Sequence, residues 1–252
     1  MRRFLTWHLP LAVALLAAFV FADGLIAFLR GDTGAPVDID LRPTAASRSA
    51  PAGVIAPIIV GDSVARGTGD ETGLGIGGRL VADLRARHVR ANNIVNLAID
   101  GSRTRDLLKT FDSPSIRRLL ADSNVIIVSI GGNDLWGDNF RAGPPTNPEH
   151  LLDEVLDRVD QSVHVVRGAS PNARVFVIGL YNPFINAPFG RALNPFVAHW
   201  NAKLIERFAT DPLVTIVQTS DIFAYEDRLS PDRFHPSGEG YERIARRIAD
   251  AV

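Results

Sequence analysis

Runs of consecutive apolar residues, many of them β-branched, recur along this 252-residue chain and constrain its fold more than any other feature. The clearest run, Val-Ile-Ile-Val-Ser-Ile, occupies positions 125–130. A strand with one face in water would alternate apolar and polar residues, whereas a continuous apolar run predicts a strand that is buried on both faces. Strands of this kind belong to parallel sheets that helices cover on both sides.

Amphipathic segments of helical length separate these runs. Strands are expected at 54–60, 94–98, 125–130, 175–180 and 214–217, and helices at 76–87, 149–167, 196–208 and 240–251. This alternation predicts a three-layer α/β/α domain with a doubly wound, parallel, five-stranded sheet. In such a sheet a ligand binds beyond the carboxyl ends of the strands, so the residues that follow the strands are the first candidates for a site.

The first 29 residues are expected to lie outside this domain as a hydrophobic helix. Arg2 and Arg3 precede a mostly apolar run at 4–29, which is the layout of a secretory signal peptide, and Ala22 offers a cleavage position. The same run is long enough to span a bilayer as an uncleaved signal anchor, which would associate the protein with a membrane. Both alternatives predict an exported, extracytoplasmic protein, either secreted or membrane-anchored.

Composition marks the remaining boundaries and excludes some classes of partner. Residues 30–53 are rich in Pro, Ala, Ser, Asp and Arg without periodicity, and we expect a flexible linker there. Residues 54–252 are long enough to form one folded domain. The formal net charge of −1 gives no reason to expect nucleic acid as a partner. The sequence has no cysteine, which excludes disulfides, thiol catalysis and thiolate metal ligands.

Three polar segments lie at the predicted carboxyl edge of the sheet. They are Gly61-Asp62-Ser63, Gly131-Gly132-Asn133-Asp134 and Asp232-Arg233-Phe234-His235-Pro236. Each one alone is also ordinary turn chemistry, because Gly, Asn, Asp, Ser and Pro all favour turns. Their common position distinguishes them, since together they supply a nucleophile, a base, a carboxylate and an amide donor.

These residue types suit acyl transfer through a serine. The hydroxyl of Ser63 is a weak nucleophile and needs a general base, for which an imidazole such as that of His235 is suited near neutral pH. Asp232, three residues before His235, can fix the tautomer of the imidazole and stabilise the imidazolium. The side-chain amide of Asn133 can donate to a developing oxyanion.

The order and spacing of these segments resemble the four sequence blocks of the SGNH (GDSL-like) hydrolase family. The blocks are Gly61-Asp62-Ser63, Asn96-Leu97-Ala98-Ile99-Asp100-Gly101, Gly131-Gly132-Asn133-Asp134 and Asp232-x-x-His235-Pro236. The resemblance extends over nearly the whole domain. Residues 63–73 are similar to the lysophospholipase-like bacterial branch, with Val64 at a position where that branch usually has leucine.

The resemblance implies a flavodoxin-like fold and a role for each residue of the site. Ser63 is expected to be the nucleophile, His235 the general base and then the general acid, and Asp232 the carboxylate that orients His235. The oxyanion hole is expected to consist of the backbone N–H groups of Ser63 and Gly101 and the side chain of Asn133. Family members of this type use no metal ion or other cofactor.

These roles predict a serine esterase that hydrolyses carboxylic esters through an acyl-enzyme on Ser63. The expected substrates are small-molecule or lipid esters: lysophospholipids, short or medium acyl esters, or O-acetyl esters. Two alternatives stay open. An O-acyltransferase of the same fold would pass the acyl group to a sugar hydroxyl instead of water, and a membrane-tethered binding module would retain the fold without turnover.

Two acidic residues and one aromatic segment lie close to these blocks in the sequence. Asp62 and Asp134 are interpreted as structural residues that hold their loops through hydrogen bonds to nearby backbone N–H groups. The segment 180–200, dense in Phe, Pro and Asn, follows a predicted strand. It either walls an acyl pocket or packs as a loop over the helices.

Two other patterns have simpler interpretations than the functional ones they suggest. Gly73-x-Gly75-x-x-Gly78 matches the dinucleotide-binding fingerprint as a string, but it does not directly follow a predicted strand. Asp70, Glu71 and Asp100 could be combined into a metal site, yet solvated loop carboxylates are the commoner case.

Overall fold

The computed structural model describes residues 13–22, 52–137, 147–224 and 226–252. The chain divides into two units, 1–44 and 45–252, and residues 13–22 of the first form a helix. In these described parts of the chain, no helix is long and apolar enough to cross a membrane. Most of the predicted signal peptide or anchor (1–29) and of the predicted linker (30–53) lies outside the described residues, so both stay predictions.

A single parallel sheet organises the domain, as predicted. Its strands are β1 (Pro57–Gly61), β2 (Val95–Asn96), β3 (Val125–Ser129), β4 (Arg174–Ile178) and β5 (Val214–Val217), in the order β2-β1-β3-β4-β5. The chain moves outward from β1 to β2 and then returns past β1 to β3, which makes the sheet doubly wound. In the register of β1 and β3, Gly61 pairs with Ser129, so these two strands end level with each other.

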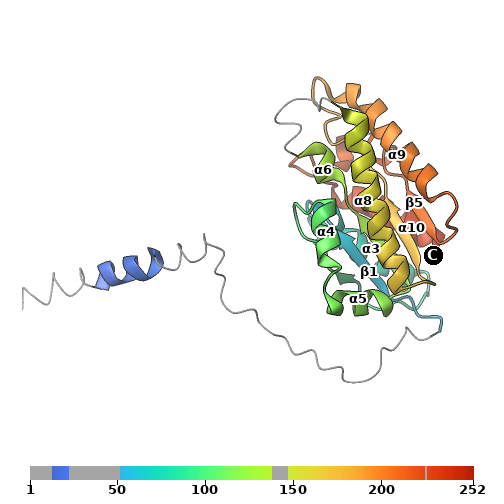
Figure 1. Cartoon of the computed structure of the whole chain (residues 1–252), viewed down its shortest axis with the longest axis horizontal. Coiled ribbons are helices and arrows are strands. Elements are labelled where there is room, and N and C mark those ends of the chain that lie inside the picture. The colour runs from blue at the N-terminus through green and yellow to red at the C-terminus, as the bar shows by residue number, and fades with distance from the viewer. Residues whose placement is uncertain (1–12, 23–51, 138–146, 225) are drawn as a thin grey trace, which may run out of the picture. The chain divides into compact units, whose positions relative to one another are not determined.

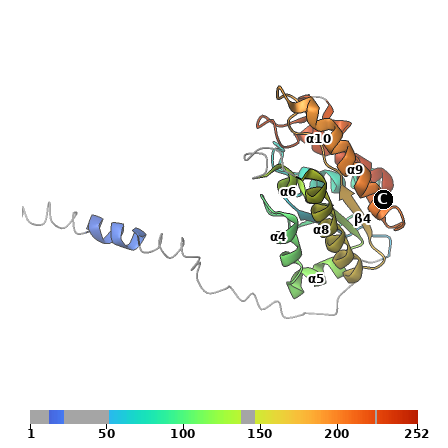
Figure 2. The same ribbon diagram turned by 45° about the horizontal axis from the view of Figure 1, so that its top comes forward.

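Helices cover both faces of this sheet (Figures 1 and 2). They are α2 (Ser63–Arg66), α3 (Gly75–Ala86), α4 (Thr104–Thr110), α5 (Pro114–Ala121), α6 (Gly132–Trp136), α8 (Pro148–Ala169), α9 (Asn194–Phe208) and α10 (Gly238–Ala251), with short 3₁₀ turns η1 (Gly190–Leu193), η2 (Ile222–Ala224) and η3 (Glu226–Arg228). On one face α8 packs beside α4, α5 and α9, and on the other α3 packs against α10.

The alternation of side chains along each strand divides the core between these faces. Ile58 and Val60 of β1 join the apolar cluster under α8 and α9, whereas Ile59 between them joins the cluster under α3 and α10. In β3, Ile126 and Ile127 divide in the same way. All these side chains are fully buried, which explains why the sequence shows continuous apolar runs.

The edge strand departs most from its predicted length. A strand is predicted at 94–98, but β2 has only two residues, and both are exposed. Beyond it, the backbone N–H groups of Leu97 and Ile99 still donate to the carbonyls of Ile59 and Gly61, at 2.9 and 3.0 Å. The chain therefore follows β1 to its carboxyl end without forming a regular ladder. Helices α4 and α5, in the segment between β2 and β3, are not among the predicted elements.

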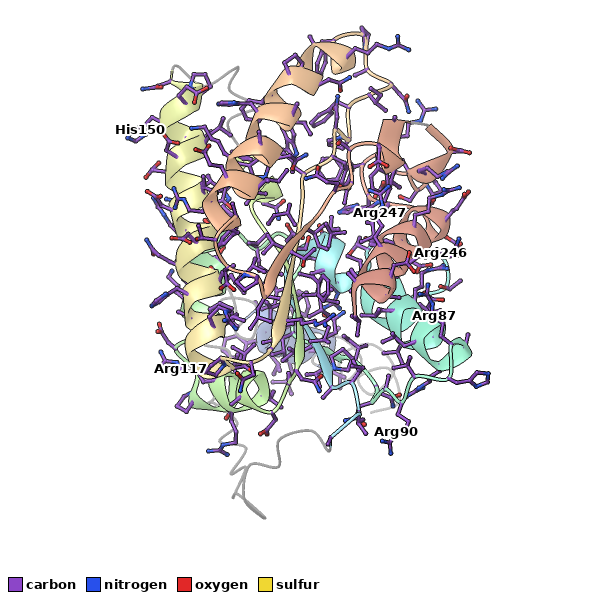
Figure 3. The ribbon with its side chains drawn as sticks, turned by 90° about the vertical axis from the view of Figure 1, so that its right-hand side faces the viewer. Arg87, Arg90, Arg117, His150, Arg246 and Arg247 are labelled. Atoms are coloured by element: carbon purple, nitrogen blue, oxygen red, sulfur yellow. The ribbon has the colours of Figure 1, made fainter. Side chains whose placement is uncertain are left out.

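Figure 3 shows the sheet between its two helical layers, with His150 at one end of α8 on one side and, on the other, Arg87 just after α3 and Arg246 and Arg247 on α10. These arginines pair with neighbouring carboxylates: Arg87 with Asp83 and Asp250, Arg246 with Glu242, and Arg247 with Asp221. Exposed pairs of this kind contribute little to stability.

Candidate active site

Ser63 begins α2 at the carboxyl end of β1. The chain turns between strand and helix at Gly61, whose φ of +138° suits glycine, and a Cβ there would overlap the carbonyl oxygen of Ser129 on β3. Asp62 then caps α2, because its Oδ1 accepts a hydrogen bond from the backbone N–H of Val64 at 3.0 Å. The turn and the cap fix Ser63 at the edge of the sheet.

His235 and Asp232 lie in a closed loop immediately before α10. The loop is closed by an antiparallel bridge between Leu229 and Pro236 and by a hydrogen bond of 2.8 Å from the backbone N–H of Ser230 to the carbonyl of His235. Oδ1 of Asp232 accepts three more hydrogen bonds. Their donors are the hydroxyl of Ser230 at 2.6 Å and the backbone N–H groups of Phe234 and His235 at 2.8 and 2.9 Å.

These contacts determine the charge of Asp232. Burial by itself would raise the pKa of its carboxyl group. The hydrogen bonds from Ser230, His235 and the loop backbone outweigh burial and hold the pKa well below its ordinary value. Asp232 is therefore an ionised carboxylate at neutral pH.

The structure brings Ser63, His235 and Asp232 into one hydrogen-bonded row. Oδ2 of Asp232 lies 2.6 Å from Nδ1 of His235, and Nε2 of His235 lies 2.9 Å from Oγ of Ser63, a residue 172 positions away in the sequence. An ionised carboxylate can only accept, so Nδ1 of His235 carries the proton and Nε2 is left to accept one from the serine. This is the arrangement that can activate a serine hydroxyl.

The loop that carries Gly101 is held against the turn at Ser63. The backbone N–H of Ile99 donates to the carbonyl of Gly61 at 3.0 Å, and the hydroxyl of Thr68 donates to Asp100 at 2.8 Å. No described residue accepts a hydrogen bond from the backbone N–H of Gly101 or from that of Ser63. Both groups are thus free to bind an oxyanion.

Asn133, the third predicted oxyanion donor, lies in α6 at the end of β3. Its Nδ2 donates to the carbonyl of Ser102 at 2.9 Å, which fixes the amide group and connects α6 to the Gly101 loop. An amide nitrogen has two protons, so the second remains for a ligand.

Asp134, the next residue, accepts hydrogen bonds from the backbone N–H and the hydroxyl of Thr104, at 2.9 and 2.6 Å. Asp62 thus accepts the backbone N–H of Val64, and Asp134 accepts that of Thr104 at the start of α4. The prediction that both residues hold loops through hydrogen bonds to backbone N–H groups is confirmed.

The carboxylates of the loop after Ser63 also have protein partners. Asp70 forms a two-pronged ion pair with Arg79 at 2.9 Å, and Glu71 accepts the backbone N–H of Gly238, at the start of α10, at 3.0 Å. Asp100 binds Thr68, as described above. Among the residues that the structure describes, no group of three or more His, Asp or Glu could hold a metal ion.

A small cavity of about 40 Å³ opens beside Ser63, at the ends of β1, β3 and β4. The polar side chains that line it are Asp62, Ser63, Ser129 and Asn133, and the large apolar ones include Trp136, Ile178, Leu180 and Trp200. The cavity lies where the ligand of a parallel α/β sheet is expected.

The aromatic segment 180–200 matches both of its predicted interpretations in part. Tyr181 and Pro183 line the cavity, whereas Phe184 packs edge-on against Trp136 and Phe234, with ring centroids 5.7 and 5.9 Å apart. Tyr181 also has a role that the sequence does not indicate, since its hydroxyl donates to the carbonyl of Phe234 at 2.8 Å and steadies the loop of His235.

Ser230 is a second supporting residue that the motifs do not reveal. Its hydroxyl binds Asp232, but the family blocks begin at Asp232 and give no signal two residues earlier.

The fold and the arrangement of this site are those of a serine hydrolase built on a three-layer α/β fold. A sequence profile of the GDSL-like lipase/acylhydrolase family matches residues 59–243. The chain belongs to this family, as the sequence blocks predict, and it is therefore an enzyme of the carboxylester hydrolase type. The alternative of a non-catalytic binding module is set aside.

Two individual relatives and one solved structure are also similar to this chain. The chain is 28% identical over 202 residues to the uncharacterized protein YpmR of Bacillus subtilis, a match that covers 77% of this chain and 79% of YpmR. It is 24% identical over 169 residues to the spore germination lipase LipC of Bacillus licheniformis, with 63% and 77% covered. The crystal structure of the lipase Lip_vut3 from a goat rumen metagenome has the same fold, with a TM-score of 0.69, 22% identity and coverage of 78% and 97%.

Proposed function

We propose that the enzyme hydrolyses carboxylic esters of short acyl chains through an acyl-enzyme on Ser63. The observation that carries this proposal is the continuous row of hydrogen bonds from Asp232 through His235 to Ser63, next to a small cavity. In this row Asp232 holds the imidazole in the tautomer that accepts a proton at Nε2.

Two displacements complete the proposed reaction. In the first, Oγ of Ser63 attacks the ester carbonyl carbon while Nε2 of His235 takes the hydroxyl proton. The tetrahedral intermediate then breaks its bond to the alcohol oxygen, which receives that proton from His235. In the second, His235 deprotonates a water molecule that attacks the acyl carbon, and Ser63 leaves with the proton as the carboxylic acid is released.

Three donors bind the negative charge that develops on the carbonyl oxygen in this proposal. They are the backbone N–H groups of Ser63 and Gly101 and the second amide proton of Asn133. The support for this role is that both backbone groups have no described acceptor and that Ser102 holds the amide in place. Donors that are already oriented need no reorganisation as the charge forms.

The size of the cavity supports a preference for short acyl groups. A water molecule needs roughly 10–15 Å³ of such a cavity. A cavity volume of about 40 Å³ therefore has room for an acyl chain of about three groups, each the size of a water molecule. A longer chain would enter only if side chains such as Trp136 and Leu180 moved.

The test is the hydrolysis of p-nitrophenyl esters, from acetate to long acyl chains, by the wild type and by Ser63→Ala. Ser162→Ala is the matched control, because Ser162 is buried in α8 and its hydroxyl binds only the carbonyl of Arg158. We expect Ser63→Ala to lower kcat by more than about 10⁴-fold and Ser162→Ala to leave it unchanged.

Two results would contradict the proposal: a Ser63→Ala variant as active as the wild type, and rates that do not vary with chain length. Addition of sugar alcohols tests the acyltransferase alternative, which predicts acylated sugar in place of free acid.

We also propose that the enzyme is exported. The support is the basic Arg2-Arg3 pair before the apolar run 4–29, part of which, 13–22, is helical. Fractionation of cells that express the full chain checks this, and accumulation in the cytoplasm would contradict it.

A further inference from the structure

Asp62, the residue before the proposed nucleophile, uses only one of its two carboxylate oxygens to hold the fold. Oδ1 accepts the hydrogen bond from Val64 that caps α2, and the hydroxyl of Ser129 lies 3.5 Å from the same oxygen. The backbone N–H groups of Ala65 and of Asp62 itself also interact with this carboxyl group, but no described donor makes a well-aligned hydrogen bond to Oδ2. Capping therefore engages Oδ1 directly and leaves Oδ2 without a well-aligned donor.

Asp62 forms part of the wall of the cavity beside Ser63. Asp62 is only 5% exposed, and it lines this cavity. A Cβ on Gly132, another lining residue, would lie 3.9 Å from Oδ2, so this oxygen lies next to a second wall residue of the cavity. Among the described residues, the only fully enclosed side-chain polar atom without a hydrogen-bond partner is Nε2 of Gln218. Oδ2 is therefore open to whatever fills the cavity.

The surroundings provide no counter-ion for this carboxyl group. None of the described residues that line the cavity is Lys, Arg or His. Burial raises the pKa of Asp62 to about 7, although hydrogen bonds from the backbone of Val64, Ala65 and Asp62 itself and from the side chain of Ser129 oppose the rise. A ligand hydroxyl suits such a group, because it can donate to the ionised form and accept from the protonated form.

We infer that Asp62 selects the acyl group: the enzyme prefers short acyl chains with a hydroxyl on the second or third carbon over alkyl chains of equal size. This inference rests on the proposed function, since the acyl chain enters the cavity only when its carbonyl lies at Ser63. A hydroxyl there pairs with Oδ2, whereas a methyl group removes water from Oδ2 and leaves it unpaired. We expect a preference of about 10- to 100-fold in kcat/KM.

The test compares pairs of esters that share one alcohol and have acyl chains of equal size. The pairs are hydroxyacetate with propionate, and 3-hydroxypropionate with butyrate. Equal numbers of heavy atoms mean that cavity volume does not distinguish the members of a pair. Each kcat/KM is divided by the rate of hydroxide-catalysed hydrolysis of the same ester, which removes the intrinsic effect of the hydroxyl on reactivity.

Asp62→Ser is the decisive variant. Serine caps a helix about as well as aspartate does, so α2 is retained while Oδ2 is removed. We expect the hydroxyacyl-to-alkyl ratio to fall to about one. The control is Asp211→Ser: Oδ1 of Asp211 likewise accepts a backbone N–H two residues on, from Leu213 at 3.0 Å. Asp211 lies before the edge strand β5, away from the cavity, and its Oδ2 pairs with Arg167 at 3.0 Å. This control should keep the wild-type ratio.

Each outcome decides between the proposals. A wild-type ratio near one, or an equal ratio in the wild type and Asp62→Ser, overturns the inference, while Ser63-dependent hydrolysis still supports the proposed function. Hydrolysis that survives in Ser63→Ala overturns both. If circular dichroism shows that Asp62→Ser does not fold, Asp62→Asn keeps the cap and the size of the side chain, and its ratio should still fall several-fold because the charge is lost.

Discussion

Replacement of Asp62 by Asn is expected to raise the free energy of unfolding, and to raise it more at pH 8 than at pH 5. Burial raises the pKa of Asp62 from its ordinary value of 3.8 to about 7 in the folded protein. The unfolded chain therefore releases this proton more easily, so the wild type loses stability as the pH rises from about 4 to about 7. Asparagine caps α2 equally well and carries no charge at any pH.

The magnitude follows from the two pKa values. One pKa unit corresponds to about 1.4 kcal/mol. A shift from 3.8 to about 7 means that ionised Asp62 destabilises the fold by roughly 4 kcal/mol at pH 8. At pH 5 the carboxyl group of Asp62 is ionised in the unfolded chain but not in the folded protein, and the loss of stability is roughly 2 kcal/mol. The gain in stability from Asp62→Asn is thus expected to be about 2–3 kcal/mol larger at pH 8 than at pH 5.

Urea unfolding at both pH values, followed by circular dichroism, measures this gain. Contributions from groups that the two proteins share cancel in the difference. Asp232, whose pKa is lowered, contributes stability that is lost only as the pH falls below the ordinary value of 3.8, outside the window. A gain that is the same at pH 5 and pH 8, within about 0.5 kcal/mol, would refute the argument that Asp62 is a desolvated acid.

Three further predictions test the site and the turn before it. Asn133→Ala is expected to lower kcat by about 10²–10³-fold with little change in KM, because one oxyanion donor is lost; unchanged turnover would remove Asn133 from the mechanism. Asp232→Asn is expected to lower kcat by roughly 10⁴-fold, because an amide can donate to Nδ1 of His235 and so favour the wrong tautomer of the imidazole. A variant with wild-type kcat at neutral pH would contradict this role. Gly61→Ala should unfold the domain or lower its Tm markedly, since a Cβ overlaps the carbonyl of Ser129; a wild-type Tm in a thermal scan would be inconsistent with this turn.

Much of the fold is predictable because it depends on local pattern. The apolar runs predict strands buried on both faces, and β1, β3, β4 and β5 all lie within or next to the predicted ranges. Amphipathic periodicity likewise predicts α3, α8, α9 and α10. The edge strand β2 and the short helices α4 and α5 are predicted poorly, since an exposed edge and a two-turn helix carry a weaker apolar signal.

The sequence by itself determined the residue types of the site and their place at the carboxyl edge, because each block follows a strand or precedes the last helix along the chain. Only the tertiary structure decided that Ser63 and His235, 172 positions apart, lie 2.9 Å from each other. It also decided that Tyr181 and Ser230 support the loop of His235 and that Asp62 lines the cavity. The physical reason is that spacing along the chain reports local geometry, whereas distances, burial and unpaired atoms arise only when separate strands pack together.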